Sequence, residues 1–311
     1  MGTPEFAVPS LAALLASRHE VVAVVTRPDR PAGRGLKLQP PPVKVLAGDH
    51  GLPVLQPAKI RDGSFLGSIL SFSPDLLAVV AYGRIIPADV LEAVPHGGVN
   101  LHASLLPRYR GAAPAAWAIA RGETTTGITT MRMAAELDAG DIYLQRSTSI
   151  GPEETTGELE SRLAALGAPF LVETIDAIGT GEIAGIPQDH AAATFAPIIG
   201  KQDGVIDWSL DARAIARRVR AFDPWPMACT RLDGKKLGVR MARAAEGDHD
   251  SDAASGNAPG TIVTADKRHV IVACGSGTLL ELLEVQPEGK RRMAATAAVA
   301  GRYLVQGARL V

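Results

Sequence analysis

Short apolar runs alternate with amphipathic segments through the first 180 residues of this chain. Apolar runs with strand-like composition predict buried strands, and stripes of apolar residues at helical spacing predict helices that pack against them. Thr3-Pro4-Glu5 begins the first helix, with Thr3 as a capping residue and Pro4 in the first turn. The remaining elements we expect in this part are strands at 21–26, 76–81, 99–101, 127–133 and 142–150, and helices at 113–121 and 155–178. This alternation is typical of a mostly parallel sheet with helices on both faces.

The pattern changes after residue 182. Residues 183–206 lack periodicity and contain Pro187 and Pro197, which predicts an interdomain linker. A helix at 211–222 follows, and then come short strand-like runs at 236–242, 260–264, 270–273 and 279–285. Short strands at regular spacing predict a small β-barrel. We therefore expect an α/β domain over 1–182, a linker over 183–206 and a barrel domain over 207–311.

Acidic and basic residues are unevenly distributed along the chain. Residues 1–200 carry 15 Lys and Arg against 20 Asp and Glu, whereas residues 201–311 carry 17 against 13. Residues 245–259 are small, polar and acidic, which predicts a mobile insertion and leaves the rest of the second domain more basic. A basic module joined to an acidic one suggests a polyanionic partner, although an ordinary solvated surface is the alternative.

The bulk composition limits the class of protein. A hydrophobic content of 46% with 21% charged residues is typical of a globular protein in the cytoplasm. We expect no membrane span and no leader, because no apolar run reaches spanning length and no basic segment precedes one. The two cysteines, Cys229 and Cys274, are too few for a disulfide framework or a zinc site. An aromatic content of 4% argues against base stacking as the main means of RNA binding.

The candidate chemistry lies at the end of the third predicted strand. Asn100 and His102 are two residues apart, so their side chains project from the same face. An amide and an imidazole at a strand end, followed by a tight loop, form a plausible edge of an active site. The alternative is a strand that simply runs out into solvent.

The residues that follow Asn100 and His102 favour the active site over a strand that runs into solvent. Asn100-Leu101-His102-Ala103-Ser104-Leu105-Leu106-Pro107, followed by Arg110-Gly111, resembles the signature of the formyltetrahydrofolate-dependent formyltransferases. Leu137-Asp138-Ala139-Gly140-Asp141 resembles the aspartate loop of that family. The segments 28–35 and 220–226 narrow the resemblance to members that act on methionyl-tRNA. Almost the whole chain is covered, with the motifs in the family's order.

The resemblance implies a reaction and its residues. Members transfer the formyl group of 10-formyltetrahydrofolate to an amine, here the amino group of initiator methionyl-tRNA, for translation initiation and without a metal. It implies that Asn100 donates to the developing oxyanion, that His102 takes part in proton transfer, and that Asp138 orients His102 or a water. It places the folate beside Ser104, Leu105, Leu106 and Pro107, with Tyr82 and Gly83 on the pterin side. The implied fold is a Rossmann-like formyltransferase domain followed by an OB-like barrel.

Basic residues are implied to bind the tRNA. The segment 27–44 is rich in proline and basic residues and is too long for a simple connection. By resemblance it enters the acceptor end of the tRNA, with Arg34 as its main reader. The other residues that we expect to contact tRNA are Arg30, Lys37, Lys201, Lys290, Arg291 and Arg292, with Arg217, Arg218 and Arg220 as backbone contacts.

The chain departs from the family pattern at two places. Ile198 stands where many members carry a lysine, while Lys201 matches. Gly2-Thr3-Pro4 follows Met1 directly, although in the family it follows a first strand of about six residues in the interior of the sheet. We therefore expect that the recorded start is misplaced and that the functional protein carries an apolar strand ahead of it. Otherwise the sheet should show a gap, or another segment in that position.

Two rival functions stay open from the sequence. One is a folate-dependent formyltransferase acting on a small nucleotide-linked amine, which would not need the basic segment 28–35. The other is a tRNA-binding protein whose catalytic domain is impaired by the missing strand. A Rossmann dehydrogenase is excluded because no G-X-G-X-X-G follows an initial strand. We expect a monomer.

Overall fold

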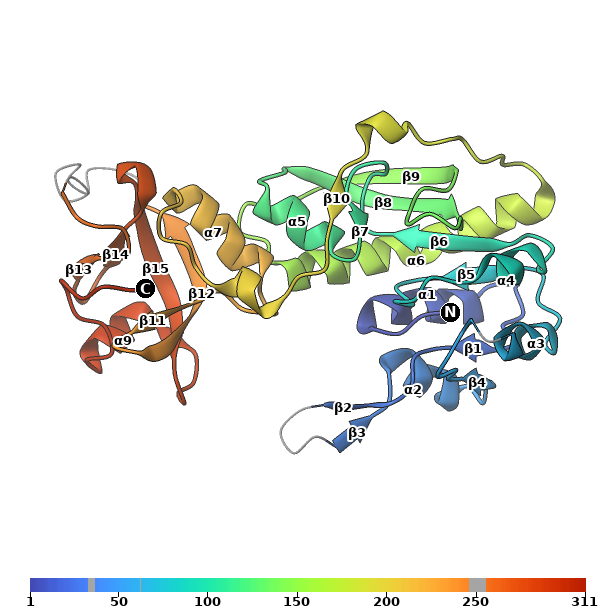
Figure 1. Cartoon of the computed structure of the whole chain (residues 1–311), viewed down its shortest axis with the longest axis horizontal. Helices are drawn as coiled ribbons and strands as arrows, with labels where there is room; N and C mark the ends of the chain where they lie inside the picture. The colour runs from blue at the N-terminus through green and yellow to red at the C-terminus, as the bar shows by residue number, and fades with distance from the viewer. Residues whose placement is uncertain (33–36, 62, 246–255) are drawn as a thin grey trace. The chain divides into compact units, whose positions relative to one another are not determined.

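The computed structural model describes residues 1–32, 37–61, 63–245 and 256–311 (Figure 1). The chain divides into two compact units: unit 1 comprises 1–114, 125–149 and 160–197, and unit 2 comprises 115–124, 150–159 and 198–311. Their helices are η1 (Glu5–Ala7), α1 (Val8–Leu15), α2 (Pro42–Asp49), α3 (Ser64–Leu70), α4 (Ala88–Glu92), α5 (Pro114–Ala120), α6 (Thr156–Thr180), η2 (His190–Ala192), η3 (Lys201–Gly204), α7 (Ala212–Ala221), η4 (Gly275–Gly277) and α9 (Ala295–Ala300).

The strands of unit 1 form several small sheets. They are β1 (Val24–Val25), β2 (Arg30–Ala32), β3 (Lys37–Gln39), β4 (Val54–Leu55), β5 (Leu77–Val79), β6 (Gly98–His102), β7 (Arg110–Gly111), β8 (Thr125–Arg132), β9 (Ile142–Ser149) and β10 (Phe195–Ala196). The largest sheet has the order β5-β6-β8-β9, and β1 pairs with β4 in a separate parallel sheet. β5 and β6 are parallel, as expected, but β8 is antiparallel to both β6 and β9. The loop 133–141 between β8 and β9 is too short for the crossover that parallel strands need.

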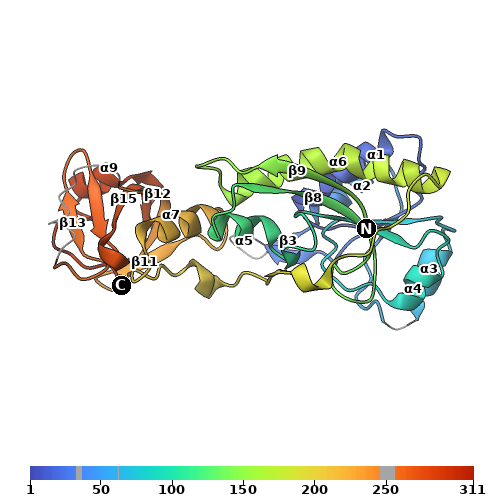
Figure 2. The same cartoon turned by 90° about the horizontal axis from the view of Figure 1, so that it is seen from above.

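Helix α6 covers one face of this sheet (Figure 2). Thr130 of β8 and Thr174 of α6 share a hydrogen bond of 2.8 Å. A Cβ on Gly167 of α6 would lie only 2.6 Å from Leu101, so that face of β6 packs tightly on the helix. Because successive side chains of a strand alternate, Asn100 and His102 project from the opposite face.

By length and composition alone, α6 is apolar enough to cross a membrane. Leu159, Leu163 and Leu171 of this helix are fully buried, and 44% of its most apolar window is buried within the protein. This burial is what a core helix shows when it packs against a sheet.

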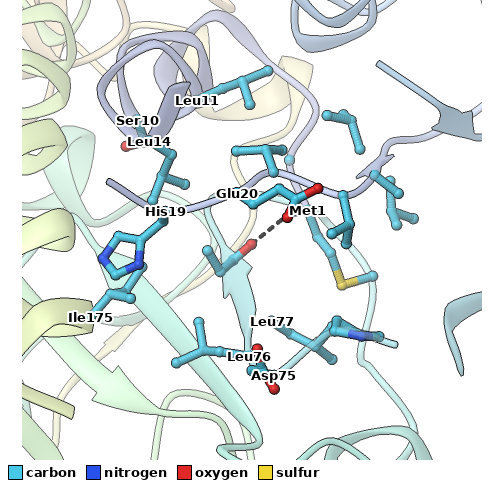
Figure 3. Close-up of a pocket in the computed structure, with 18 of the residues that line it drawn as sticks. Met1, Ser10, Leu11, Leu14, His19, Glu20, Asp75, Leu76, Leu77 and Ile175 are labelled. Atoms are coloured by element: carbon cyan, nitrogen blue, oxygen red, sulfur yellow. Dashed lines mark hydrogen bonds between the residues drawn. The ribbon is translucent and has the colours of Figure 1, made fainter. Parts of the chain in front are cut away.

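A gap separates the two parts of the unit 1 sheet, in agreement with the expectation from the first residues. Met1 and Gly2 lie in the gap: the Gly2 N–H donates to the Val25 carbonyl at 3.0 Å, and the Val80 N–H donates to the Met1 carbonyl at 2.9 Å. Beyond Met1 the gap continues as a cavity of about 700 Å³ (Figure 3). Its walls come from the segments 21–25 and 76–78 and from apolar residues of α1 and α6.

Unit 2 contains a curled antiparallel sheet. The strands are β11 (Cys229–Leu232), β12 (Lys235–Ala244), β13 (Ile262–Ala265), β14 (Val270–Ala273), β15 (Leu279–Pro287) and β16 (Met293–Ala294), in the order β11-β12-β15-β14-β13 with β16 against β15. Residues 308–311 connect its two outer strands, because Val311 exchanges backbone hydrogen bonds with Arg231 while Leu310 and Ala308 bond to Gly260 and Ile262. The sheet therefore closes around a core that includes Val219 of α7, as the barrel expectation requires.

Several local expectations differ from the structure. Thr3 does not cap a helix; its hydroxyl donates to the Tyr82 carbonyl, and the helix begins after Pro4. The expected strand 21–26 is reduced to β1, which pairs with β4 over two residues. The expected acidic insertion lies largely in residues 246–255, outside the described part of the chain.

Candidate active site

His102 ends β6 and is held by a main-chain carbonyl. Its Nε2 lies 2.9 Å from the carbonyl oxygen of Tyr109, and the residue is only 6% exposed. A carbonyl oxygen can only accept a hydrogen bond, so this contact requires a proton on Nε2. In the neutral imidazole, Nδ1 is then the nitrogen with a free lone pair. The fold therefore fixes which nitrogen can take up a proton.

Asp138 faces that nitrogen. Its Oδ2 lies 3.7 Å from Nδ1 of His102, longer than a direct hydrogen bond, and accepts the Gly111 N–H at 2.8 Å. Asp138 has a left-handed backbone (φ 49°), a conformation that Asp tolerates better than most residues. Gly140 makes this loop possible, because a Cβ there would lie 1.9 Å from the Arg132 carbonyl oxygen.

Asn100 lies on the same face of β6. The residue is 9% exposed, and its amide makes no side-chain hydrogen bond with any residue that the structure describes. A mostly buried amide without an internal partner retains both N–H donors for a ligand. Asn100, His102 and Asp138 thus supply an amide donor, a proton acceptor and a carboxylate on one side of the sheet.

The loop after His102 satisfies its own polar groups. The Ser104 hydroxyl donates to the Arg108 carbonyl at 2.6 Å, and the Leu106 N–H donates to the Thr129 hydroxyl at 3.2 Å. Gln145 donates to the Leu106 carbonyl and to the same Thr129 hydroxyl. These bonds give the loop a fixed shape. They leave the Ser104 hydroxyl and the Leu106 main chain with less capacity for a ligand than the sequence suggested.

The expected pterin side combines buried polar atoms with positive charge. Among the described residues, the Tyr82 hydroxyl and Arg27 Nε are buried without a hydrogen-bond partner. Burial raises the pKa of Tyr82, and Arg84 and Arg27 oppose that shift. Arg27 also approaches Gly83, since a Cβ there would lie 3.3 Å from its guanidinium. Unpartnered buried polar atoms keep their hydrogen-bonding capacity for a ligand, which fits the polar edge of a pterin ring.

The residues expected to bind tRNA lie in two places. Arg30 is in β2 and Lys37 in β3 of one hairpin, and Arg34 lies outside the described residues. Lys201, Lys290, Arg291 and Arg292 are exposed residues of unit 2. Lys290 lies 6.0 Å from the centre of the Tyr303 ring, and Arg292 is ion-paired with Glu284.

Two of the arginines expected to contact the tRNA backbone are engaged within unit 2. Arg220 donates to the Glu154 carbonyl at 2.9 Å, and Arg218 donates to the Asp203 carbonyl at 3.1 Å. Burial lowers the pKa of the Arg220 guanidinium. Both side chains therefore already hold parts of unit 2 together.

Sequence reasoning missed the residues that support the catalytic candidates. Tyr109 and Gly111 act through main-chain atoms, which no side-chain motif reveals. Gln188 lies in the segment expected to be a linker, and its amide bonds the carbonyls of Asp138 and Gly140. The strand pairing of β10 with β7 attaches this segment to unit 1.

The cavity of Figure 3 is not this site. None of Asn100, His102 or Asp138 lines it, and its walls are mostly apolar. It lies where Met1 enters the sheet, whereas Asn100 and His102 lie on β6 and Asp138 lies in the loop between β8 and β9. Among the described residues, no group of three or more His, Cys, Asp or Glu is placed to hold a metal ion.

Comparison with known proteins identifies the family. Residues 1–175 match the model of the formyl transferase domain, and residues 198–303 match that of the formyl transferase C-terminal domain. A methionyl-tRNA formyltransferase of Geotalea daltonii is 47% identical over all of this chain and 96% of its own length. One from Geobacter metallireducens is 48% identical over all of this chain and 97% of its own length.

A solved structure shares the fold. An N-formyltransferase from Helicobacter canadensis, in complex with folinic acid and dTDP-3-aminofucose, has a TM-score of 0.63 at 15% identity over 92% of this chain and 97% of that chain. At this identity the likeness concerns the fold. Two family domains matched in order, and relatives of nearly half identity over the full length, show that the chain belongs to the methionyl-tRNA formyltransferase family.

Proposed function

We propose that this protein transfers the formyl group of 10-formyltetrahydrofolate to the amino group of initiator methionyl-tRNA. The observation that carries the proposal is the placement of Asn100, His102 and Asp138 on one side of the sheet, in a chain whose full-length relatives are methionyl-tRNA formyltransferases. The product would serve translation initiation, which makes the protein a one-carbon transferase.

Transfer of a formyl group to an amine has three requirements. The attacking amine must lose a proton, the formyl oxygen must be stabilised as it gains negative charge, and the departing nitrogen must gain a proton. The folate supplies the formyl group. As the new carbon–nitrogen bond forms and the old one breaks, one proton leaves the amine and one reaches the leaving nitrogen, so the overall transfer is balanced.

His102 and Asp138 suit the proton transfers. Because Tyr109 holds the proton on Nε2, Nδ1 of His102 can accept the proton of the amine and later release it. Asp138 lies on the Nδ1 side and carries the charge that stabilises an imidazolium. At 3.7 Å the direct hydrogen bond between Nδ1 and Oδ2 is not made, so both atoms keep capacity for an amine or a water that bonds to them from the side.

The Asn100 amide is suited to donate a hydrogen bond to the formyl oxygen as it becomes negatively charged. This amide is held on a strand rather than a loop and has no internal partner among the described residues. A preorganised amide donor of this kind contributes about 10²- to 10³-fold in kcat in acyl transfer. Tyr82, Gly83 and the loop 104–107 would hold the folate, with Tyr82 and Gly83 on the pterin side.

The basic residues would hold the tRNA. Arg30 and Lys37 of the hairpin, together with Arg34, would read the acceptor end. The phosphate backbone would be contacted by Lys201, Lys290, Arg291 and Arg292. We propose that the enzyme acts as a monomer in the cytoplasm and uses no metal.

A single-turnover assay tests the proposal. Charged initiator tRNA and 10-formyltetrahydrofolate are mixed with excess enzyme, and formylmethionine is measured after the ester is hydrolysed. We expect formylation by the wild type and a loss of about 10²- to 10³-fold with Asn100→Ala. Formylation of a nucleotide-linked sugar amine with none of methionyl-tRNA would favour the small-amine alternative. Tight tRNA binding without formylation of either would favour the impaired tRNA-binding protein.

A further inference from the structure

Arg110 is buried without a close carboxylate. The residue is 2% exposed, and its Nη1 lies 3.9 Å from Oε1 of Glu136, whose side chain is exposed. Its guanidinium instead makes two hydrogen bonds to Oε1 of Gln188, at 3.1 Å from Nε and 2.7 Å from Nη2. Nη2 also lies 3.3 Å from Nδ1 of His190. A buried charge that is satisfied by neutral groups is costly, so its retention calls for a reason.

Arg110 fixes the orientation of the Gln188 amide. A guanidinium only donates, so the amide oxygen must face Arg110 and the NH₂ group must face away from it. That NH₂ donates to the carbonyl of Asp138 at 2.9 Å and to the carbonyl of Gly140 at 2.7 Å. Gln188 thereby holds both carbonyls of the loop in which Asp138 has its left-handed backbone.

The main chain on either side of Arg110 contacts the two catalytic candidates. The Tyr109 carbonyl accepts from Nε2 of His102, and the Gly111 N–H donates to Oδ2 of Asp138. Arg110 therefore reaches Asp138 by two routes, through its own following amide and through Gln188.

We propose that Arg110 and Gln188 are positioning residues that hold the Asp138 carboxylate at its distance from Nδ1 of His102. The inference rests on the proposed function for its catalytic consequence. A merely structural pair would behave differently: replacing a buried polar pair by apolar groups of similar volume is often neutral or stabilising. Such a change would then leave turnover unaltered.

Three variants test the contributions of Arg110 and Gln188 separately. Gln188→Glu keeps an acceptor for Arg110 but removes both donors to the loop carbonyls. Gln188→Ala removes the whole amide, and Arg110→Met removes the charge while filling a similar volume. We expect each to lower kcat by about 10²-fold, because displacement of a catalytic group by about 1 Å costs that much. The KM values for folate and tRNA should change by no more than roughly threefold.

A second readout requires no substrate. Hydrogen exchange of the Gly111 amide reports its bond to Asp138, and we expect it to accelerate at least about tenfold in the three variants relative to the amides of β8. Thr174→Val is the matched control, since it removes a buried hydrogen bond to Thr130 on the other face of the sheet. It should lower stability while kcat and the relative exchange of Gly111 stay at wild-type values.

The two readouts distinguish the possible failures. Wild-type kcat and wild-type Gly111 exchange in Gln188→Glu and Arg110→Met would overturn the positioning role. If the wild-type enzyme formylated no amine, the proposed function would fail, and the exchange measurement would still decide whether Gln188 holds the Asp138 loop. Should Gln188→Ala not fold, the other two variants carry both measurements.

Discussion

One main-chain contact determines which nitrogen of His102 faces Asp138. Because the Tyr109 carbonyl holds the Nε2 proton, the imidazole presents Nδ1 to the carboxylate side of the site. The Asp138 carboxylate is held in position by the Gly111 N–H and not by a hydrogen bond to His102. Its position therefore does not depend on its interaction with the imidazole. A substitution can therefore remove the charge and leave the position intact.

Asp138→Asn tests the charge alone. An asparagine oxygen can still accept from Gly111, so the loop should keep its shape while the negative charge is lost. We expect kcat for methionyl-tRNA formylation to fall by about 10²- to 10⁴-fold, as for His102→Ala, with tRNA affinity nearly unchanged. Asp141→Asn, in the same loop, is the control and should keep kcat. Near-normal turnover in either catalytic variant would show that its residue does not move or stabilise the proton.

At the scale of elements, the gap between β1 and β5 is the feature with the largest consequence for stability. The Met1 ammonium is buried there, 2.6 Å from the Ala78 carbonyl oxygen, and burial lowers its pKa to about 5. The facing strands β1 and β5 are only two and three residues long. An extended segment running parallel to them could pair with both and fill the cavity with apolar side chains.

Fusing an apolar strand ahead of Met1 tests this geometry. A segment of about six Val and Ile residues should raise the free energy of unfolding by on the order of 3–6 kcal/mol, since full burial of two of its side chains at about 1.5–3 kcal/mol each gives that much. Denaturant unfolding measures the change, and a Gly/Ser segment of equal length is the control. Equal stability of the two fusions would show that the cavity does not accept a strand.

The same fusion should remove a pH dependence. In a chain that begins with a free Met1 amine, the folded-state pKa of about 5 lies below the ordinary pKa of 8.0 of such an amine. Between these values the unfolded state binds more protons, so this group makes stability rise as the pH increases from 5 to 8. In the fused protein the amine is no longer buried in the gap. That rise should therefore disappear from its unfolding curves measured across this range.

At the scale of the whole molecule, the uneven charge of the chain matters for its partner. Residues 201–311 carry the excess of basic residues, and Lys290 and Arg291 are exposed there. Arg292 is exposed as well but paired with Glu284, so its charge is partly compensated. Contacts of this kind should act on any tRNA, whereas Arg34 is expected to discriminate between tRNAs.

Affinity measurements in a salt series separate the two roles. Changing Lys290, Arg291 and Arg292 to Ala should weaken initiator and elongator tRNA alike and reduce the salt slope by roughly two units rather than three, because of Glu284. Arg34→Ala should instead reduce the preference for the initiator tRNA. Equal losses in both variants would contradict the division.

The sequence by itself determined the catalytic candidates and the order of the main elements. Period-two alternation places Asn100 and His102 on one face whatever the rest of the chain does, and helical spacing marks α6, because both depend on local backbone geometry. The antiparallel return of β8 and the closing of the barrel by residues 308–311 come from hydrogen bonds between segments far apart in the chain.

Only the tertiary structure decided what holds the site in place. The proton on His102, the position of Asp138 and the roles of Arg110 and Gln188 depend on main-chain atoms and on partners up to 78 residues apart. A glutamine in a segment without periodicity has no local signal that distinguishes it from a surface residue. Gln188 reaches the Asp138 loop only because β10 pairs with β7 and attaches this segment to unit 1. Its role therefore depends on its position in space and not on its residue type.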